Sequence, residues 1–372
     1  MNIPNWPIST DRELELLKQV LESGKWGGYH EIVTRFEEAF AAFQHCKHGV
    51  AAVNGTVTLE MALAAAGVGP GDEVIVPAIS FISTATAVSR VGATPVFVDI
   101  EPYSFNMDPE RAAAAISPRT KAILVVHFGG QLAEMDRLLA LAADRNLILI
   151  EDAAHAHGSE WNGRRAGSLG LAGSFSFQNS KVMTAGEGGI VTTSDADLAE
   201  RVRALGNQGR RTGGGWFFHY TLGTNSRLSG WQAAVLLAQL ERLPEQIGLR
   251  MRNAETLRAR WADIPGLKLQ QTPPQVNQNS YYLLMGRIDA GRLGISRDKF
   301  CSTLTEQGIA CAPYYPHTLY RNELYQNGGC RVEPCPVAEE TIHDAFWFPH
   351  RVLMGDEETT LEIADAVQRL GR

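Results

Sequence analysis

The residue of this 372-residue chain best suited to chemistry is Lys181, within "SFSFQNSKVMTAGEGG", residues 174–189. Polar and apolar residues alternate over the first four positions, a pattern that predicts a half-buried strand. Glycines follow the lysine and allow the backbone to turn tightly or to approach a ligand (Gly186, Gly188 and Gly189). A lysine amine in such a place can act as a nucleophile and form a Schiff base. The alternative is a solvated surface lysine, the ordinary position of a single lysine.

A pair of carboxylates precedes this lysine in "LILIEDAAHAHG", where Glu151 and Asp152 directly follow an apolar strand. A carboxylate at a strand end can hold a positively charged ring nitrogen through a charge-assisted hydrogen bond. A capping or surface acid is the alternative. His155 and His157 come next and could bind a metal, but no third ligand has a recognisable spacing. We therefore expect histidines that contact a cofactor or the core.

A third group of residues is suited to binding phosphate. Gly55 and Thr56, in "VNGTVTLEMALAAAG", stand where a helix should begin. The free backbone N–H groups and the dipole of a helix start attract anions, and a threonine hydroxyl adds a donor. A plain threonine N-cap is the alternative. Ser176 is expected on the same rim of the sheet as Lys181. A phosphate cradle, a strand-end aspartate, a strand serine and a lysine before glycines together describe a site for pyridoxal 5'-phosphate (PLP).

The elements that must position these residues alternate in type from about residue 48 to 245. Apolar runs at 73–81, 94–100, 121–128 and 147–153 read as strands, and helical patterns follow the first three. This order predicts parallel strands with crossover helices around a buried sheet. Further strands fit 173–178 and 189–194. A long helix is expected over 229–247, and the proline inside it is expected to kink or end it.

The pattern changes beyond about residue 250. Strands are predicted in "SYYLLMGRI" and "IACAPYY", and helices in "SRDKFCSTLTEQG" and "DEETTLEIADAVQRL". A mixture of this kind without the alternating rhythm predicts a smaller α+β domain. We expect a large domain over residues 1–250 and a small one over 251–372. The join has no flexible linker composition, so the two are expected to pack firmly.

Composition excludes several classes of partner. The chain is 44% hydrophobic and 20% charged, with a formal net charge of −7. Such a charge argues against nucleic acid or an anionic membrane as the main partner. Neither a signal peptide nor a membrane helix is predicted, so a cytoplasmic protein is expected. Five scattered cysteines argue against a disulfide framework. Cys330 and Cys335 are half of a metal site at most, and reduced thiols are expected instead.

Over nearly its whole length the sequence resembles the DegT/DnrJ/StrS-type sugar aminotransferases. The resemblance runs through "GKWGG", "NGT", "VIVPAISFIST", "EDAAHAHG", "FSFQNSKVMTAGEGG", "GTNSRLSGWQAAVLLAQL" and "CAPYYPHTLYR". It implies the type I, aspartate aminotransferase-like PLP fold, with a large, mixed and mostly parallel seven-stranded sheet. The match is similar to members that aminate keto-cyclitols and to aminohydroxybenzoate synthases.

The resemblance also implies a role for each matching residue. Lys181 would form the Schiff base with PLP, and Asp152 would pair with the pyridine nitrogen. Other positions would contact the cofactor within the chain, namely Gly55, Thr56, Phe81, His155 and Ser176. Asn225 would reach the phosphate of the neighbouring subunit, which makes the active site shared across a homodimer. Tyr314 and His317 would line the substrate pocket.

The implied activity is the transfer of an amino group from L-glutamine or L-glutamate to a keto sugar or keto-cyclitol, in two half-reactions. Neither a metal nor a membrane takes part. A lyase resembling aminohydroxybenzoate synthase is a second reading, and a PLP-binding regulator or non-catalytic scaffold is a third. The acceptor remains open among a sugar nucleotide, a cyclitol and a keto sugar acid.

Overall fold

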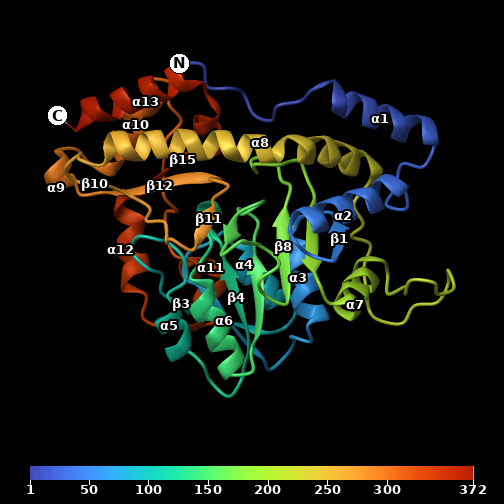
Figure 1. Ribbon diagram of the computed structural model, residues 1–372. Coiled ribbons are helices and arrows are strands. Elements are labelled where there is room, and N and C mark those ends of the chain that lie inside the picture. The colour runs from blue at the N-terminus through green and yellow to red at the C-terminus, as the bar shows by residue number, and fades with distance from the viewer. Residues whose placement is uncertain (372) are drawn as a thin grey trace.

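The computed structural model describes residues 1–371, and a large mixed sheet lies at its centre (Figure 1). The strand order is β1-β9-β8-β5-β4-β2-β3-β14. β9 is antiparallel to β1 and β8, and the other neighbours are parallel. The bounds are β1 (His48–Ala52), β2 (Glu73–Pro77), β3 (Thr94–Val98), β4 (Thr120–Val126), β5 (Ile148–Asp152), β8 (Ala172–Ser176), β9 (Gly189–Thr193) and β14 (Arg331–Val332). The predicted alternation of strands and helices is confirmed, with the two-residue β14 added at the edge.

Helices cover both faces of this sheet because its strands are apolar on both sides. Ile75 of β2 belongs to a core with α2, α5, α6 and α8 (Gly230–Trp261), whereas Val74 and Val76 belong to a core with α3, α4 and α7. The helices not yet bounded are α2 (Glu31–Phe43), α3 (Gly55–Ala65), α4 (Ser83–Arg90), α5 (Pro109–Ala114), α6 (Met135–Asp144), α7 (Ala196–Gly206) and the 3-10 turn η1 (Phe128–Gly130). Burial on both faces is the expected state of parallel strands.

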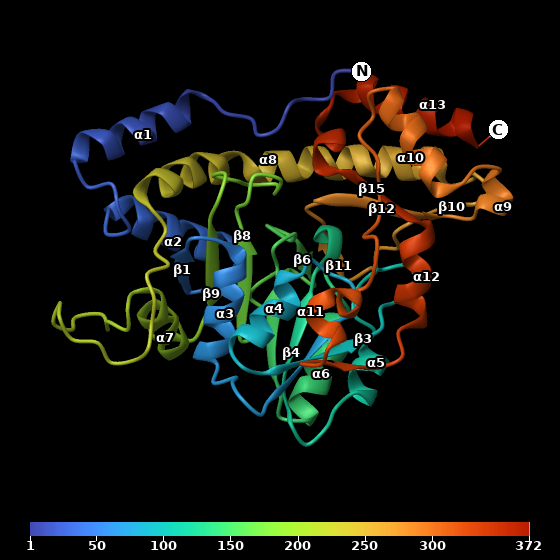
Figure 2. The ribbon, with the colours of Figure 1, turned by 180° about the vertical axis from the view of Figure 1, so that it is seen from behind.

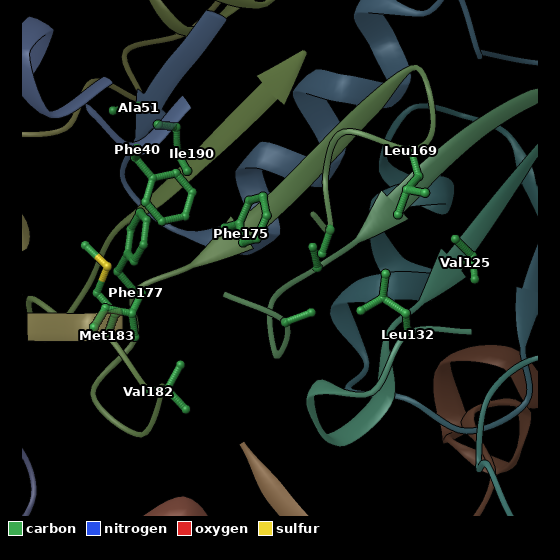
Figure 3. Packing of buried hydrophobic residues seen from close by; sticks show 14 of the residues in the cluster. Phe40, Ala51, Val125, Leu132, Leu169, Phe175, Phe177, Val182, Met183 and Ile190 are labelled. Carbon is green, nitrogen blue, oxygen red and sulfur yellow. The ribbon is translucent and has the colours of Figure 1, made fainter. Parts of the chain in front are cut away.

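Aromatic packing fixes β8 against α2 (Figure 3). The ring of Phe40 in α2 lies edge-on to Phe175 and Phe177, with centroids 5.0 and 5.2 Å apart. All three side chains are fully buried. Edge-to-face pairs of this kind stabilise beyond their buried area. The strand that leads to Lys181 is therefore held rigidly up to Phe177.

The long helix α8 (Gly230–Trp261) runs across the upper part of the molecule, below α1 and α13 (Figures 1 and 2). The proline expected to end or kink it, Pro244, lies inside the helix, which continues to Trp261. The predicted end of this helix at residue 247 is therefore wrong. Leu243 and Ile247, on either side of the proline, are buried against the large sheet. Their packing offsets a loss of about 3 kcal/mol for a proline in a helix. α1 (Asp11–Ser23) lies alongside α8.

A second, antiparallel sheet has the order β10-β12-β15-β13. Its strands are β10 (Leu267–Leu269), β12 (Leu283–Ile288), β13 (Ala312–Pro313) and β15 (Ala345–Pro349). The predicted strand β12 is confirmed, the one in "IACAPYY" shrinks to β13, and β15 was not predicted. The surrounding helical segments are α9 (Ala290–Leu293), α10 (Arg297–Glu306), η2 (Leu319–Arg321), α11 (Glu323–Gln326), α12 (Pro336–Asp344), η3 (His350–Met354) and α13 (Glu357–Leu370). Apolar residues of α9, α10, η3 and α13 form a core with this sheet. Leu319 of η2 and Tyr325 of α11 pack instead in a core of the large sheet.

The chain crosses between these two parts more than once. Residue 250, the predicted boundary, lies inside α8, and β14 returns to pair with β3 at the edge of the large sheet. Ile3 packs against the core of the smaller sheet. A third, small sheet joins β11 (Val276–Gln278) to β6 (Glu160–Trp161) and β7 (Arg164–Arg165). Over residues 1–371, no helix combines the length and the apolar character needed to cross a membrane.

Candidate active site

A cavity of about 600 Å³ lies beyond the carboxyl ends of β5 and β8, where open α/β sheets bind ligands. Register brings these ends together, because Asp152 pairs with Val126 of β4 on one side and with Ser174 of β8 on the other. The cavity contains most of the predicted cofactor contacts: Gly55, Thr56, Phe81, Asp152, His155, Ser176 and Lys181. Segments far apart in the sequence therefore meet at one site.

The start of α3 forms one wall of the cavity. Asn54, and not Thr56, is the N-cap, because its side chain accepts a hydrogen bond of 2.9 Å from the backbone N–H of Val57. The hydroxyl of Thr56 instead lies 2.7 Å from that of Ser83 at the start of α4. The plain threonine cap is thus excluded. Two hydroxyls and the first N–H groups of α3 remain available to an anion.

Gly55 permits β8 to approach this helix start closely. A Cβ atom at Gly55 would lie 2.7 Å from Cβ of Ser176 and 3.3 Å from its hydroxyl. The loop after Lys181 makes a second close approach, because a Cβ at Gly189 would lie 2.5 Å from the backbone of Asn54. These glycines bring Ser176 and the α3 start into one concave surface.

Asp152 is buried at the base of the cavity, with 6% of its surface exposed. Its Oδ2 accepts a hydrogen bond of 2.7 Å from the hydroxyl of Thr84, and its Oδ1 accepts one of 3.3 Å from the N–H of Ala154. Burial raises the pKa of Asp152, while the Thr84 hydroxyl, the Ala154 N–H and the charge of Lys181 oppose that rise. A cation beside this carboxylate would therefore be paired strongly.

The neighbouring carboxylate of Glu151 does not line the cavity but serves the fold. It accepts hydrogen bonds from the backbone N–H groups of Gly167, Leu169 and Gly170, at 2.7 to 2.8 Å. It also lies 2.9 Å from Nε2 of His127. Successive strand residues point to opposite faces. Of the two acids, only Asp152 reaches the cavity.

Lys181 follows β8 and lines the same cavity as Asp152. Its Nζ lies 4.6 Å from the ring centroid of Tyr282, a cation–π distance. The ring of His155 lies against the same tyrosine, with centroids 4.3 Å apart and planes inclined by 32°. Nδ1 of His155 accepts a hydrogen bond of 3.3 Å from the N–H of Gly129. Burial and the charge of Lys181 lower the pKa of His155 well below its usual value, so its ring is neutral.

His157 lies outside the cavity, beneath it. Its Nε2–H donates a hydrogen bond of 2.9 Å to the carbonyl of Ser176, and Phe175 and Phe177 surround its ring. Burial lowers the pKa of His157 to about 3. Over residues 1–371 no group of three or more His, Cys, Asp or Glu residues is placed to hold a metal ion. Cys330 and Cys335 are free cysteines, and each thiol donates a hydrogen bond to a backbone carbonyl.

Three predicted site residues lie away from the cavity. Tyr314 is buried among aromatic rings, and His317 is exposed with Nδ1 3.0 Å from the carbonyl of Thr318. The neighbouring Tyr315 lines the cavity instead. Asn225 is exposed, in a backbone bridge with Asn207, and does not reach the cavity of its own chain.

Sequence reasoning missed several residues of the site. Ser83 and Thr84 follow the predicted strand at 73–81, and hydroxyl residues at a strand-to-helix turn were the available signal. Tyr282, Tyr315 and Trp347 belong to the smaller part of the chain and line the cavity from the other side. No spacing in the sequence connects them with Lys181.

Comparison with known proteins identifies the family. The model of the DegT/DnrJ/EryC1/StrS aminotransferase family matches residues 7–368. The 3-amino-5-hydroxybenzoate synthase of Amycolatopsis mediterranei is 40% identical over 382 residues, covering 98% of this chain and 97% of that protein. The L-glutamine:2-deoxy-scyllo-inosose aminotransferase of Streptoalloteichus tenebrarius is 39% identical over 407 residues, covering 99% and 94%.

The fold agrees with that result. A crystal structure of 3-amino-5-hydroxybenzoic acid synthase matches with a TM-score of 0.93 and 38% identity, covering 99% of this chain and 98% of that chain. The similarity thus extends over both sheets and includes every segment that lines the cavity. The chain belongs to the DegT/DnrJ/EryC1/StrS aminotransferase family and has the α/β fold of type I PLP enzymes.

Proposed function

We propose that this protein moves an amino group from L-glutamine or L-glutamate to a keto-cyclitol or keto sugar. The carrying observation is that Lys181 and Asp152 line one cavity together with the α3 start and the hydroxyls of Thr56 and Ser176. Members of the family use PLP. The 39% identity to an L-glutamine:2-deoxy-scyllo-inosose aminotransferase supports glutamine as donor and a keto-cyclitol as acceptor.

The donor set of the cavity fits PLP. The hydroxyls of Thr56 and Ser83 lie 2.7 Å apart beside the start of α3, and with Ser176 they would hold a phosphate. The close approach of Gly55 to Ser176 shapes this cradle. The carboxylate of Asp152 would pair with the ring nitrogen, and Phe81 and His155 would contact the ring.

When bound, PLP supplies an aldehyde that condenses with amines and a ring that withdraws electrons from the adjacent carbon. Lys181 would hold the cofactor through its Nζ until the amino donor displaces it. The freed Nζ would take the proton from the α-carbon of the donor as general base and would deliver it as general acid to the aldehyde-derived carbon of PLP. Asp152 would keep the ring nitrogen protonated, because its carboxylate is buried and oriented by Thr84 and would therefore favour a paired cation. Use of one site for two half-reactions predicts ping-pong kinetics.

Residues of the smaller sheet would enclose the reacting atoms. Tyr282, Tyr315 and Trp347 add an aromatic lining to the cavity. An enclosed site excludes water and strengthens the interaction between Asp152 and a bound cation. Burial raises the pKa of Tyr315, so its phenol is a hydrogen-bond donor for a hydroxylated substrate ring.

We further propose a homodimer in which Asn225 completes the cavity of the partner subunit. Asn225 is exposed and lies away from its own cavity, on the segment between α7 and α8. The same segment exposes large apolar side chains, including Phe217 at 85% and Leu222 at 94%. An exposed apolar surface of this kind favours a protein interface.

A second candidate is a lyase similar to 3-amino-5-hydroxybenzoate synthase. The 40% identity to that enzyme and the TM-score of 0.93 favour it. Such a reaction would use the same Lys181 for proton transfer, but its product would be an aromatic aminohydroxybenzoate. The two candidates therefore differ in their products and not in their catalytic groups.

An acceptor screen on the pyridoxamine-phosphate form tests the proposal. Keto-cyclitols, keto sugars and sugar nucleotides are offered in turn, and return of the visible pyridoxal band reports amination. Lys181→Ala is the control and should show no return. A new ultraviolet band from an aromatic product, without amination, would favour the lyase. Failure of every amino donor to convert the pyridoxal form would overturn the aminotransferase, and failure to form an aromatic product as well would overturn the lyase in favour of a regulator.

A further inference from the structure

Lys181 is carried by an exposed turn. β8 ends at Ser176, and the side chains of Gln178, Asn179 and Ser180 are exposed. The N–H of Lys181 donates a hydrogen bond of 2.9 Å to the carbonyl of Gln178, which closes the turn. Phe177 before the turn and Val182 after Lys181 are fully buried and anchor its two ends. The exposed residues between them have no core contacts, so the side chains that bond to their carbonyls add to the hold on the lysine.

Two such side chains come from opposite ends of the sequence. The indole N–H of Trp6 donates a hydrogen bond of 3.1 Å to the carbonyl of Asn179. Nε2–H of His350 donates one of 3.1 Å to the carbonyl of Ser180. The two rings meet edge to face, with centroids 4.5 Å apart and planes at 86°. Successive carbonyls before Lys181 are thus fixed by rings that also support each other.

The charge state of His350 suits this role. Burial and the charge of Arg250 lower the pKa of His350 to about 3, so the ring is neutral at ordinary pH. Its Nε2 faces a carbonyl and therefore carries the proton. The donor to Ser180 is present over the whole range in which the protein would work.

Tyr282 extends the contact into the cavity. Its ring is stacked on His350, with centroids 6.1 Å apart and planes at 24°, and its hydroxyl lies 3.0 Å from that of Ser180. Nζ of Lys181 lies 4.6 Å from the centroid of the same ring. Trp6, His350 and Tyr282 together form what we call the aromatic clamp.

Trp6 is itself held at both sides of its segment. The N–H of Asn2 donates a hydrogen bond of 2.9 Å to the hydroxyl of Thr359 in α13. On the other side, the carbonyl of Ile8 accepts hydrogen bonds from Gln239 and Arg242 in α8, at 2.9 and 3.2 Å. Figures 1 and 2 show the N-terminal segment running from α13 along α8 to α1. The position of Trp6 is therefore set independently of the turn.

We propose that Trp6 is a positioning residue for Lys181. It holds the carbonyl of Asn179, and with His350 and Tyr282 it fixes the turn that points the Lys181 amine into the cavity. The inference rests on the proposed function only in its consequence for catalysis, because its structural part holds for the protein without cofactor.

Trp6→Phe tests the proposal, because it keeps a ring against His350 and removes the indole donor. In the protein without cofactor, hydrogen exchange at the amides of residues 179–182 should become about five- to tenfold faster, as expected for one lost hydrogen bond. In the protein with PLP, the fraction trapped on Lys181 by brief borohydride treatment should fall. With an accepted substrate, kcat should fall by a similar factor with KM nearly unchanged. Tyr282→Phe, which removes the hydroxyl contact to Ser180, should act in the same direction.

Trp261→Phe is the matched control. Its indole N–H also donates to a backbone carbonyl, that of Ala364 at 3.2 Å, but in the core of the smaller sheet. It should lower thermal stability and leave exchange in the turn and labelling of Lys181 unchanged. Equal exchange in wild type and Trp6→Phe would overturn the proposal. If borohydride labels another lysine in the wild type, the proposed function fails while the exchange measurement still decides the role of Trp6.

Discussion

The hydroxyl of Thr84 donates a hydrogen bond of 2.7 Å to Oδ2 of Asp152, and the two residues come from different crossover units of the large sheet. Thr84 lies in α4, which follows β2, whereas Asp152 ends β5. The Thr84 hydroxyl also lies 2.7 Å from that of Ser80. The carboxylate is thus oriented toward the cavity by a chain of hydroxyls, while its burial raises its pKa.

Asp152→Asn should slow proton transfer at the donor α-carbon by at least about 100-fold, the size of a general acid–base contribution. The amide keeps an oxygen for Thr84 but loses the charge that would stabilise a protonated ring nitrogen. PLP should still bind through the phosphate cradle. Stopped-flow absorbance of the half-reaction with L-glutamine measures the rate. Near-normal turnover would mean that another acid serves the ring nitrogen. Thr84→Val, which keeps the charge, should have a much smaller effect.

Gly55→Ala should weaken PLP retention by about 10- to 100-fold, equivalent to the loss of one charge-assisted hydrogen bond. The added Cβ would meet Ser176 at 2.7 Å and displace the α3 start from β8. Equilibrium dialysis against PLP provides the measurement. Gly69→Ala is the control, because the nearest atom to its added Cβ would be 3.9 Å away. Equal retention in both variants would show that the close approach does not shape the cradle.

The sequence allowed prediction of the sheet and of one side of the site. Each apolar run in the sequence marks a strand, and the residue after the run marks the carboxyl end of that strand. Chain order alone therefore placed Asp152 and Ser176 at the same edge of the large sheet. Tyr282 and His350 contact the Lys181 turn only because the smaller sheet folds back over the cavity. The prediction ended α8 too early because the low helix propensity of Pro244 is a local property. It does not include the burial of Leu243 and Ile247, which stabilises the helix there. Tertiary packing decided each of these cases.

Asn225→Ala should weaken PLP retention by about 10- to 100-fold, because an amide bond to a phosphate dianion is charge-assisted. The sharper measurement mixes Asn225→Ala subunits with Lys181→Ala subunits at limiting PLP. In a mixed dimer one site carries both lesions and the other carries neither, so activity should return toward one working site per dimer. The control is the Lys181→Ala protein alone, taken through the same exchange procedure. A mixture that stays inactive despite proven subunit exchange would contradict the shared site.

Acid should destabilise the protein through its buried histidines. The pKa values of His157 and His350 are lowered to about 3, whereas unfolded histidine titrates near 6.5. Between these values the unfolded chain binds more protons, so the free energy of unfolding falls as pH falls through this window. Each histidine contributes a slope of up to about 1.4 kcal/mol per pH unit.

Urea unfolding of the protein without cofactor at pH 7.5, 6 and 5 measures this slope. His157→Phe should make it shallower, because phenylalanine fits the aromatic surroundings and does not titrate. His343→Gln changes an exposed histidine and should leave the slope unaltered. The raised pKa of Asp152 contributes an opposite slope, which is common to all three proteins and drops out of the comparison. Identical slopes in wild type and His157→Phe would refute the assignment.

The continuity of α8 through Pro244 ties the energetics of the two parts together. One stretch of the helix places Leu243 and Ile247 in a core of the large sheet, and the next places Leu257 and Trp261 in the core of the smaller sheet. Melting either core alone would strip half of a continuous helix of its packing, and a helix of that kind has little stability in isolation. The chain should therefore unfold cooperatively. A cut at residue 250 should yield two fragments, neither of which folds on its own.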